Sequence, residues 1–117
     1  MANNFINRGE VLTLHARDAR EDGKPYRECG FNGVALKNAD PQESYTLQIR
    51  GVFEFDLPGV EVGDLIYIDW IGELMFLAED DLVNRAENTA LGWMLFGRAV
   101  TSSDVTGCFQ CLILQSE

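Results

Sequence analysis

The sequence predicts an all-β protein, a single small antiparallel β-barrel or β-sandwich of about seven strands with an extended N-terminal arm. Short apolar runs recur along the 117 residues, separated by clusters of Gly, Pro, Asn and Asp. In several runs apolar and polar residues alternate, which places them on opposite faces of a strand. No linker or fixed-period repeat divides the chain. We therefore expect an arm over residues 1–8 and a single β domain over residues 9–117.

The first half of the chain predicts two short strands and one long one. Residues 10–15 alternate and form the first strand, and residues 33–36 form the second. Between them, residues 17–28 hold eight charged side chains in twelve positions, together with Gly23 and Pro25, which indicates a solvated loop, or at most one helical turn over residues 17–22. Residues 44–57 read as one long strand, with a bulge or bend expected at Gly51.

The centre of the chain, residues 51–70, reads as strand, tight turn, strand. Apolar residues at 53, 55 and 57 face one way, and acidic residues at 54 and 56 face the other. Pro58 fixes φ and Gly59 tolerates positive φ, as a tight turn requires. Residues 65–68 then begin the next strand. We expect this segment to be scaffold with one dry face and one negatively charged face.

The remaining residues predict three further strands. The first covers residues 73–77, and the polar stretch 79–89 after it is either a loop or the one short helix. Residues 91–100 are apolar almost throughout, which suits a strand buried on both faces. Residues 107–114 form the final strand.

The formal net charge of −10 is concentrated in one segment. Residues 51–84 hold nine acidic side chains and no basic one, whereas residues 1–50 balance to zero. Nucleic-acid binding needs Lys and Arg clustered on one face, so we expect neither DNA nor RNA as a partner. The acidity is either an ordinary solvated surface or a surface that meets a basic protein and mimics nucleic acid.

The sequence also lacks features of membrane insertion and export. It has no run of about 18 apolar residues, and its start has neither the basic nor the apolar region of a signal peptide. We expect no membrane partner. Three cysteines, an odd number, indicate free thiols in a reducing cytoplasm.

The cysteines suggest two kinds of chemistry, a redox pair and a zinc site. Cys108 and Cys111 form a C-x-x-C, but on a strand residues three apart face opposite ways, which disfavours a redox pair. Cys29, Cys108, Cys111 and His15 provide four potential zinc ligands, but without the spacing of a zinc site. We favour cysteines that are small apolar core residues, with no metal and no cofactor.

No combination of nucleophile, base and orienting group emerges from the sequence, so we do not expect an enzyme. His15 has no Ser or Cys partner at a motif spacing. Gly23-Lys24 is followed by Pro25 and lacks the preceding glycine of a phosphate-binding loop.

Five blocks appear in a characteristic order: NNFINRGEVLTLHA, GFNGVALKNADPQESYTLQIRGVFEF, VEVGDLIYID, ALGWMLFGRAV and a short closing strand. In this order and spacing, over roughly residues 3–115, the chain resembles a small phage-associated family. Its members are encoded beside major capsid protein genes and act as capsid decoration, or cement, proteins.

The resemblance implies a protein that binds the outside of a phage head and stabilises contacts between major capsid protein subunits. The implied partners are the major capsid protein and further copies of the chain, with a trimer favoured and a dimer as the alternative. The implied location is the virion exterior, with the host cytoplasm during assembly. We expect partner contacts at Phe5 and Ile6 in the arm, and at Arg17 and Arg20 in the charged loop. The alternative function is an acidic DNA mimic that binds a basic protein.

Overall fold

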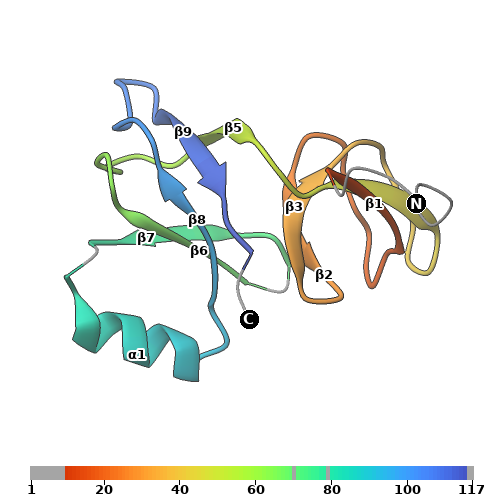
Figure 1. Ribbon diagram of the computed structural model, residues 1–117, viewed down its shortest axis with the longest axis horizontal. Helices are drawn as coiled ribbons and strands as arrows, with labels where there is room; N and C mark the ends of the chain where they lie inside the picture. The colour runs from red at the N-terminus through yellow and green to blue at the C-terminus, as the bar shows by residue number, and fades with distance from the viewer. Residues whose placement is uncertain (1–9, 70, 79, 116–117) are drawn as a thin grey trace, which may run out of the picture.

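Two antiparallel sheets make up the protein in the computed structural model, which describes residues 10–69, 71–78 and 80–115 (Figure 1). The four-stranded sheet has the order β1-β4-β3-β2, with β1 (Val11–His15), β4 (Ser44–Gln48), β3 (Phe31–Ala35) and β2 (Pro25–Glu28). The five-stranded sheet has the order β5-β9-β8-β6-β7, with β5 (Val52–Asp56), β9 (Cys108–Ile113), β8 (Met94–Ala99), β6 (Leu65–Ile68) and β7 (Leu74–Leu77). The all-β prediction is confirmed, with nine described strands in a small sandwich-like fold.

Each sheet has its own apolar core. In the four-stranded sheet, the buried cluster consists of Ala16, Tyr26, Ala35, Ala39, Tyr45, Leu47 and Ile49. In the five-stranded sheet, it consists of Phe55, Val60, Ile66, Ile68, Phe96, Ala99, Phe109, Cys111 and Ile113, joined by Val34 from β3. The two sheets lie toward opposite ends of the longest axis, in a molecule of 44 × 34 × 30 Å (Figure 1).

Two glycines allow neighbouring strands to approach. A Cβ at Gly33 on β3 would overlap the carbonyl oxygen of Gln48 on β4, and a Cβ at Gly97 on β8 would overlap that of Leu112 on β9. Any other residue at these positions would push the strands apart. The glycines therefore help to set the spacing within both sheets.

The two sheets are joined by hydrogen bonds between Asn32 on β3 and the segment after β9. Asn32 is fully buried, and its Nδ2 donates to the carbonyl oxygens of Leu95 (2.8 Å) and Leu114 (2.7 Å). Gln115 accepts from the Asn32 backbone N–H (2.9 Å) and donates to the carbonyl oxygens of Asn32 (2.7 Å) and Ile49 (2.8 Å). These directional bonds fix how the sheets meet, because each buried polar group has its partner there.

The polar stretch after β7 forms the one helix of the described residues, α1 (Leu82–Ala90). Asp81 caps its N-terminus, with Oδ1 accepting from the Asn84 backbone N–H at 3.2 Å. Gly92, at φ +95°, follows the C-terminus and turns the chain into β8. Of the loop and the helix left open by the sequence, the helix is the one that forms.

The prediction of one continuous strand over residues 44–57 was wrong, although the bend expected at Gly51 is present. The chain breaks at Gly51, whose φ of +124° lies outside the range of a strand. Its two halves, β4 and β5, belong to different sheets. The shared alternation is real, but it continues through a bend that redirects the chain.

The strand–turn–strand prediction for residues 51–70 was also wrong in its pairing. Gly59 does take a positive φ of +87° in the turn, yet β5 and β6 are not neighbours. β5 pairs with β9, from Val52↔Leu112 to Asp56↔Cys108, and β6 lies between β7 and β8. The short connection between β5 and β6 favours a hairpin of these two strands, but β5 pairs instead with β9, which is distant in the sequence.

The charged loop predicted over residues 17–28 contains a strand instead. Its second half is β2, which pairs with β3 from Pro25↔Val34 to Glu28↔Phe31. Pro25, Tyr26 and Glu28 are buried. The density of charge therefore concealed an edge strand whose acidic residue points into the protein.

Candidate functional site

The four predicted partner contacts have different positions. Phe5 and Ile6 lie outside the described residues, so their placement stays a prediction. Arg17 is exposed, whereas Arg20 is only 3% exposed. The Nε of Arg20 donates to Glu28 Oε1 at 3.1 Å. The Arg20 side chain is therefore part of the interior in this fold, and of these two arginines only Arg17 is exposed to solvent.

Glu28 is the centre of a buried polar cluster. Its Oε1 also accepts from the Tyr45 hydroxyl (3.0 Å) and from the Arg17 backbone N–H (3.1 Å). The Arg20 guanidinium lies 4.5 Å from the centre of the Tyr26 ring. Its Nη2 is 3.1 Å from Glu28 Oε1, an ionic contact whose angle is not that of a hydrogen bond. The cluster ties the loop before β2 to the four-stranded sheet.

The surroundings of Tyr45 support a structural role for this cluster. Burial, followed by the neighbouring Glu28 carboxylate, raises the pKa of Tyr45 above its ordinary value. The hydroxyl therefore stays protonated and remains a donor to Glu28. Nothing in the sequence marked this arrangement, because Arg20 and Glu28 are eight positions apart and Tyr45 comes from another strand.

A cavity of about 390 Å³ lies where the two sheets meet, and it includes the exposed Arg17. Its lining consists of Arg17, Arg27, Glu28, Cys29, Gly30, Ile68, Asp69, Gly92 and Met94. Arg27 Nη1 donates to Asn32 Oδ1 at 3.0 Å, and partial burial lowers the pKa of Arg27. Two arginines face two carboxylates, so the cavity has no net charge with which to select an anion or a cation.

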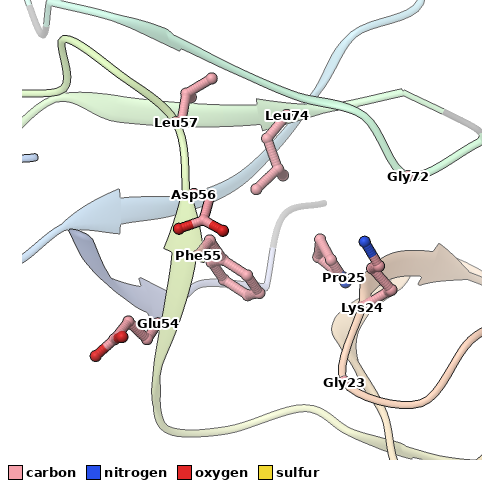
Figure 2. Close-up of a pocket in the computed structure, with 9 residues that line it drawn as sticks. All are labelled: Gly23, Lys24, Pro25, Glu54, Phe55, Asp56, Leu57, Gly72 and Leu74. Carbon is pink, nitrogen blue, oxygen red and sulfur yellow. The ribbon is translucent and has the colours of Figure 1, made fainter. Parts of the chain in front are cut away.

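A groove of about 310 Å³ separates β5 from the turn before β2 (Figure 2). It is lined by Gly23, Lys24, Pro25, Glu54, Phe55, Asp56, Leu57, Gly72 and Leu74. Figure 2 shows β5 on one side and the 23–25 turn on the other, with Leu57 and Leu74 at one end. Four consecutive residues of the β5 region line it, so the unpaired edge of this strand borders the groove.

The outward face of β5 is strongly acidic. Glu54 and Asp56 are exposed there, opposite Gln110 and Cys108 of β9 respectively. The Cys108 thiol donates to Glu54 Oε1 at 2.9 Å. That hydrogen bond, with further contributions from burial and from Asp56, raises the pKa of Cys108 to about 12. The thiol is therefore not a nucleophile at neutral pH, and the face carries a negative potential suited to a basic partner.

Another carboxylate, that of Asp104, lies in the turn before β9 and accepts several hydrogen bonds there. Asp104 Oδ1 accepts from the Thr106 hydroxyl (2.7 Å), the Thr106 backbone N–H (2.8 Å) and the Cys108 backbone N–H (3.0 Å). These bonds, chiefly those from Thr106, lower the pKa of Asp104. The carboxylate stays ionised and orders the turn.

The cysteines and His15 are not brought together. Cys29 is exposed in the β2–β3 turn, Cys108 is half-buried and Cys111 is buried. Cys108 and Cys111 face opposite sides of β9, as the strand alternation predicted. Within the described residues, no three His, Cys, Asp or Glu side chains are arranged to hold a metal ion. The expectation of small buried apolar cysteines holds for Cys111 alone.

Among the residues that the structure describes, no helix is long and apolar enough to cross a membrane. Comparisons of the chain with family models, curated proteins and solved structures found no match.

Proposed function

We propose that the chain is a capsid decoration protein, which binds the outside of a phage head and stabilises contacts between major capsid protein subunits. Its partners are then the major capsid protein and further copies of itself, in a trimer or a dimer. The protein acts on the virion exterior after a period in the host cytoplasm.

The observation that supports this function is the ordered set of sequence blocks, whose described residues include strands of the fold. GFNGVAL spans the β2–β3 turn and β3, VGDLIYI contains β6, and GWMLFGRA contains β8. Two of these blocks include the close-approach glycines, Gly33 and Gly97. The blocks behind the family resemblance are thus the ones that set strand spacing and order.

The surface is suited to a binding role. Large apolar side chains are exposed on both sheets, their loops and the helix: Val11, Phe31, Leu36, Val52, Val62, Ile71, Leu82, Val83, Leu91, Val100, Val105 and Leu112. Exposed apolar side chains that lie together mark surfaces for protein partners. A cement protein needs such contact surfaces on a rigid scaffold and no active site.

Co-sedimentation with phage heads tests this function. Purified protein is mixed, at micromolar concentration, with expanded, undecorated heads of the phage that encodes it. We expect the protein to pellet with the heads and to raise the temperature at which they rupture. Protein that stays in the supernatant at all concentrations overturns the proposed function.

A second candidate is an acidic protein that mimics DNA, and the concentration of negative charge in residues 51–84 favours it. Glu54 and Asp56 are exposed together on one face of β5. Spaced carboxylates on a flat strand face are what a basic nucleic-acid-binding protein would meet.

Charge neutralisation separates the two functions. The variant Glu54→Gln, Asp56→Asn, Glu61→Gln, Asp64→Asn removes four charges from β5 and the loop that follows it. A DNA mimic would lose binding to its basic partner, with strong salt dependence in the parent protein. Head binding that survives in this variant supports decoration and excludes the acidic face as the main contact.

A further inference from the structure

The helix α1 is oriented with its apolar side away from the protein. Leu82, Val83 and Leu91 are 68%, 72% and 76% exposed, and Ala86 and Ala90 are exposed beside them. At about 100° per residue, Leu82, Val83, Ala86 and Ala90 fall within one stripe about 100° wide. We call these four residues, together with the exposed Leu91 at the C-cap, the α1 stripe. Helices of soluble proteins usually turn such a stripe inward.

Polar contacts hold the opposite side of α1 against the five-stranded sheet. Arg85 Nε donates to the Tyr67 hydroxyl at 3.3 Å, and Asn88 Nδ2 lies 2.9 Å from the sulfur of Met75. Asn88 is the one buried residue of the helix. Figure 1 shows α1 at the margin of the molecule, beside β6 and β7. The outward stripe is therefore a consequence of defined contacts, which fix the rotation of the helix.

The charges beside the stripe indicate what covers it. Asp80 and Glu87 are exposed next to it, and Asp81 is half-buried at the N-cap. The one basic residue of the helix, Arg85, is turned toward Tyr67. An apolar stripe with a carboxylate border complements an apolar groove with Lys or Arg at its rim.

A second copy of the chain is a poor occupant. A nine-residue helix is about 13 Å long, so the stripe offers much less than the roughly 800 Å² that each partner contributes to a stable interface. Packing two stripes together would also bring their carboxylates close, in a chain whose net charge is −10. The small area limits any partner of the stripe equally, so it is the charges that favour a different, basic protein.

We propose that α1 is the docking helix of this protein, and that its apolar stripe inserts into an apolar groove with a basic rim on the outer surface of the capsid shell. This inference rests on the proposed function, and it names the surface through which that function operates. The fold supplies the rigid support, and α1 supplies the contact.

The test compares two variants with the parent protein in the head-binding titration. The first is Leu82→Ser, Val83→Ser, Leu91→Ser. The second, Val105→Ser, is the matched control, because Val105 is fully exposed in the β8–β9 loop at the other end of the five-stranded sheet (Figure 1). Stripe residues are exposed, so we expect the same thermal unfolding midpoint for all three proteins. We expect at least about tenfold weaker head binding for the stripe variant and parent affinity for Val105→Ser.

Three outcomes overturn the inference, and they are distinguishable. If the parent binds and the stripe variant binds equally well, α1 is not the docking helix but the proposed function stands. If the parent itself does not bind, both fall. If the stripe variant instead shows a smaller mass than the parent by light scattering, the stripe joins copies of the chain.

The basic rim has its own test. The variant Asp80→Asn, Glu87→Gln removes the carboxylate border and keeps the apolar stripe. We expect binding several-fold weaker than that of the parent at low salt, with the difference disappearing at high salt. Equal affinity at every salt concentration overturns the assignment of a basic partner surface.

Discussion

At the scale of single residues, the buried contact between Arg20 and Glu28 has the largest expected energetic effect. Glu28→Gln removes the carboxylate that pairs with Arg20, whose side chain is only 1% exposed. Removing one partner of a buried ion pair costs about 3–5 kcal/mol of unfolding free energy. Urea denaturation followed by tryptophan fluorescence measures this loss.

Tyr45→Phe is the matched control for that experiment. It leaves the ion pair intact and removes only the hydroxyl that donates to Glu28. A loss of about 1 kcal/mol is expected, as for one hydrogen bond. If Glu28→Gln costs no more than Tyr45→Phe, the charge interaction contributes nothing beyond a hydrogen bond.

The second prediction at this scale concerns the reactivity of Cys108. Its pKa of about 12 leaves only about one thiol in ten thousand ionised at pH 8. Alkylation by iodoacetamide is then slow at pH 8 and rises about tenfold for each pH unit up to the pKa. Peptide mass spectrometry across pH 7–11 measures it for this cysteine separately.

Glu54→Gln provides the comparison for Cys108. Removing the carboxylate that accepts from the thiol lowers the thiol pKa, so alkylation at pH 8 should become faster. Glu61 lies in the loop after β5, so Glu61→Gln should leave the alkylation rate of Cys108 unchanged. Equal rates in the parent and in Glu54→Gln would show that the carboxylate does not control this thiol.

At the scale of elements, strand spacing depends on glycine. Gly97→Ala places a methyl group against the carbonyl oxygen of Leu112 and the sulfur of Cys111, on the strand paired with β8. Overpacking of this kind costs about 1–3 kcal/mol, and the upper end applies because the obstacle is backbone. Thermal denaturation should show a lower midpoint.

Gly23→Ala distinguishes overlap from backbone strain. Gly23 has a positive φ of +81°, but a Cβ there meets nothing within 4 Å. We expect a smaller loss than for Gly97→Ala. Similar losses in the two variants would mean that overlap with β9 is not what excludes a side chain at position 97.

The elements themselves were largely predictable, because alternation and turn residues are local signals. Strands were expected near β1, β3, β6, β7, β8 and β9, and each is present. Strand partners were not predictable, because nothing local distinguishes the observed β5–β9 pair from a β5–β6 hairpin. β2 was missed because its inward Glu28 looks like one more surface charge until Arg20 and Tyr45 are placed beside it.

Of the candidate surfaces, one could be predicted from local sequence signals and others could not. The acidic face of β5 followed from the alternation of residues 52–56, and the structure places Glu54 and Asp56 outward. The burial of Arg20 and the outward turn of α1 depend on tertiary contacts. The apolar spacing of residues 82, 83, 86 and 90 was visible in the sequence, but a helical period alone would have predicted an inward face.

At the scale of the whole molecule, we expect the contacts of Gln115 to couple the unfolding of the two sheets. Gln115→Ala removes three hydrogen bonds to Asn32 and Ile49. Each such bond contributes about 1 kcal/mol, and the Asn32 N–H would lose its partner. We expect faster amide hydrogen exchange at Asn32 and a widening difference in protection between residues 11–48 and 52–113.

Gln110→Ala is the control for this experiment. Gln110 lies on β9 with its side chain exposed, and no bond from that side chain links the two sheets. Its exchange pattern should match that of the parent. If Gln115→Ala also keeps equal protection in both halves, the Asn32 side-chain hydrogen bonds to Leu95 and Leu114 and the packing around Val34 couple the sheets instead.

The pairing of β5 with β9 has a consequence for synthesis on the ribosome. All four strands of the first sheet fall within residues 11–48, so that sheet can form soon after this segment leaves the exit tunnel. β5 emerges next but has no partner until Cys108–Ile113 has been translated. During that interval the nascent chain displays an acidic strand whose charges repel those of neighbouring copies. The carboxylates of β5 should therefore disfavour pairing between the β5 strands of neighbouring nascent chains before β9 is available.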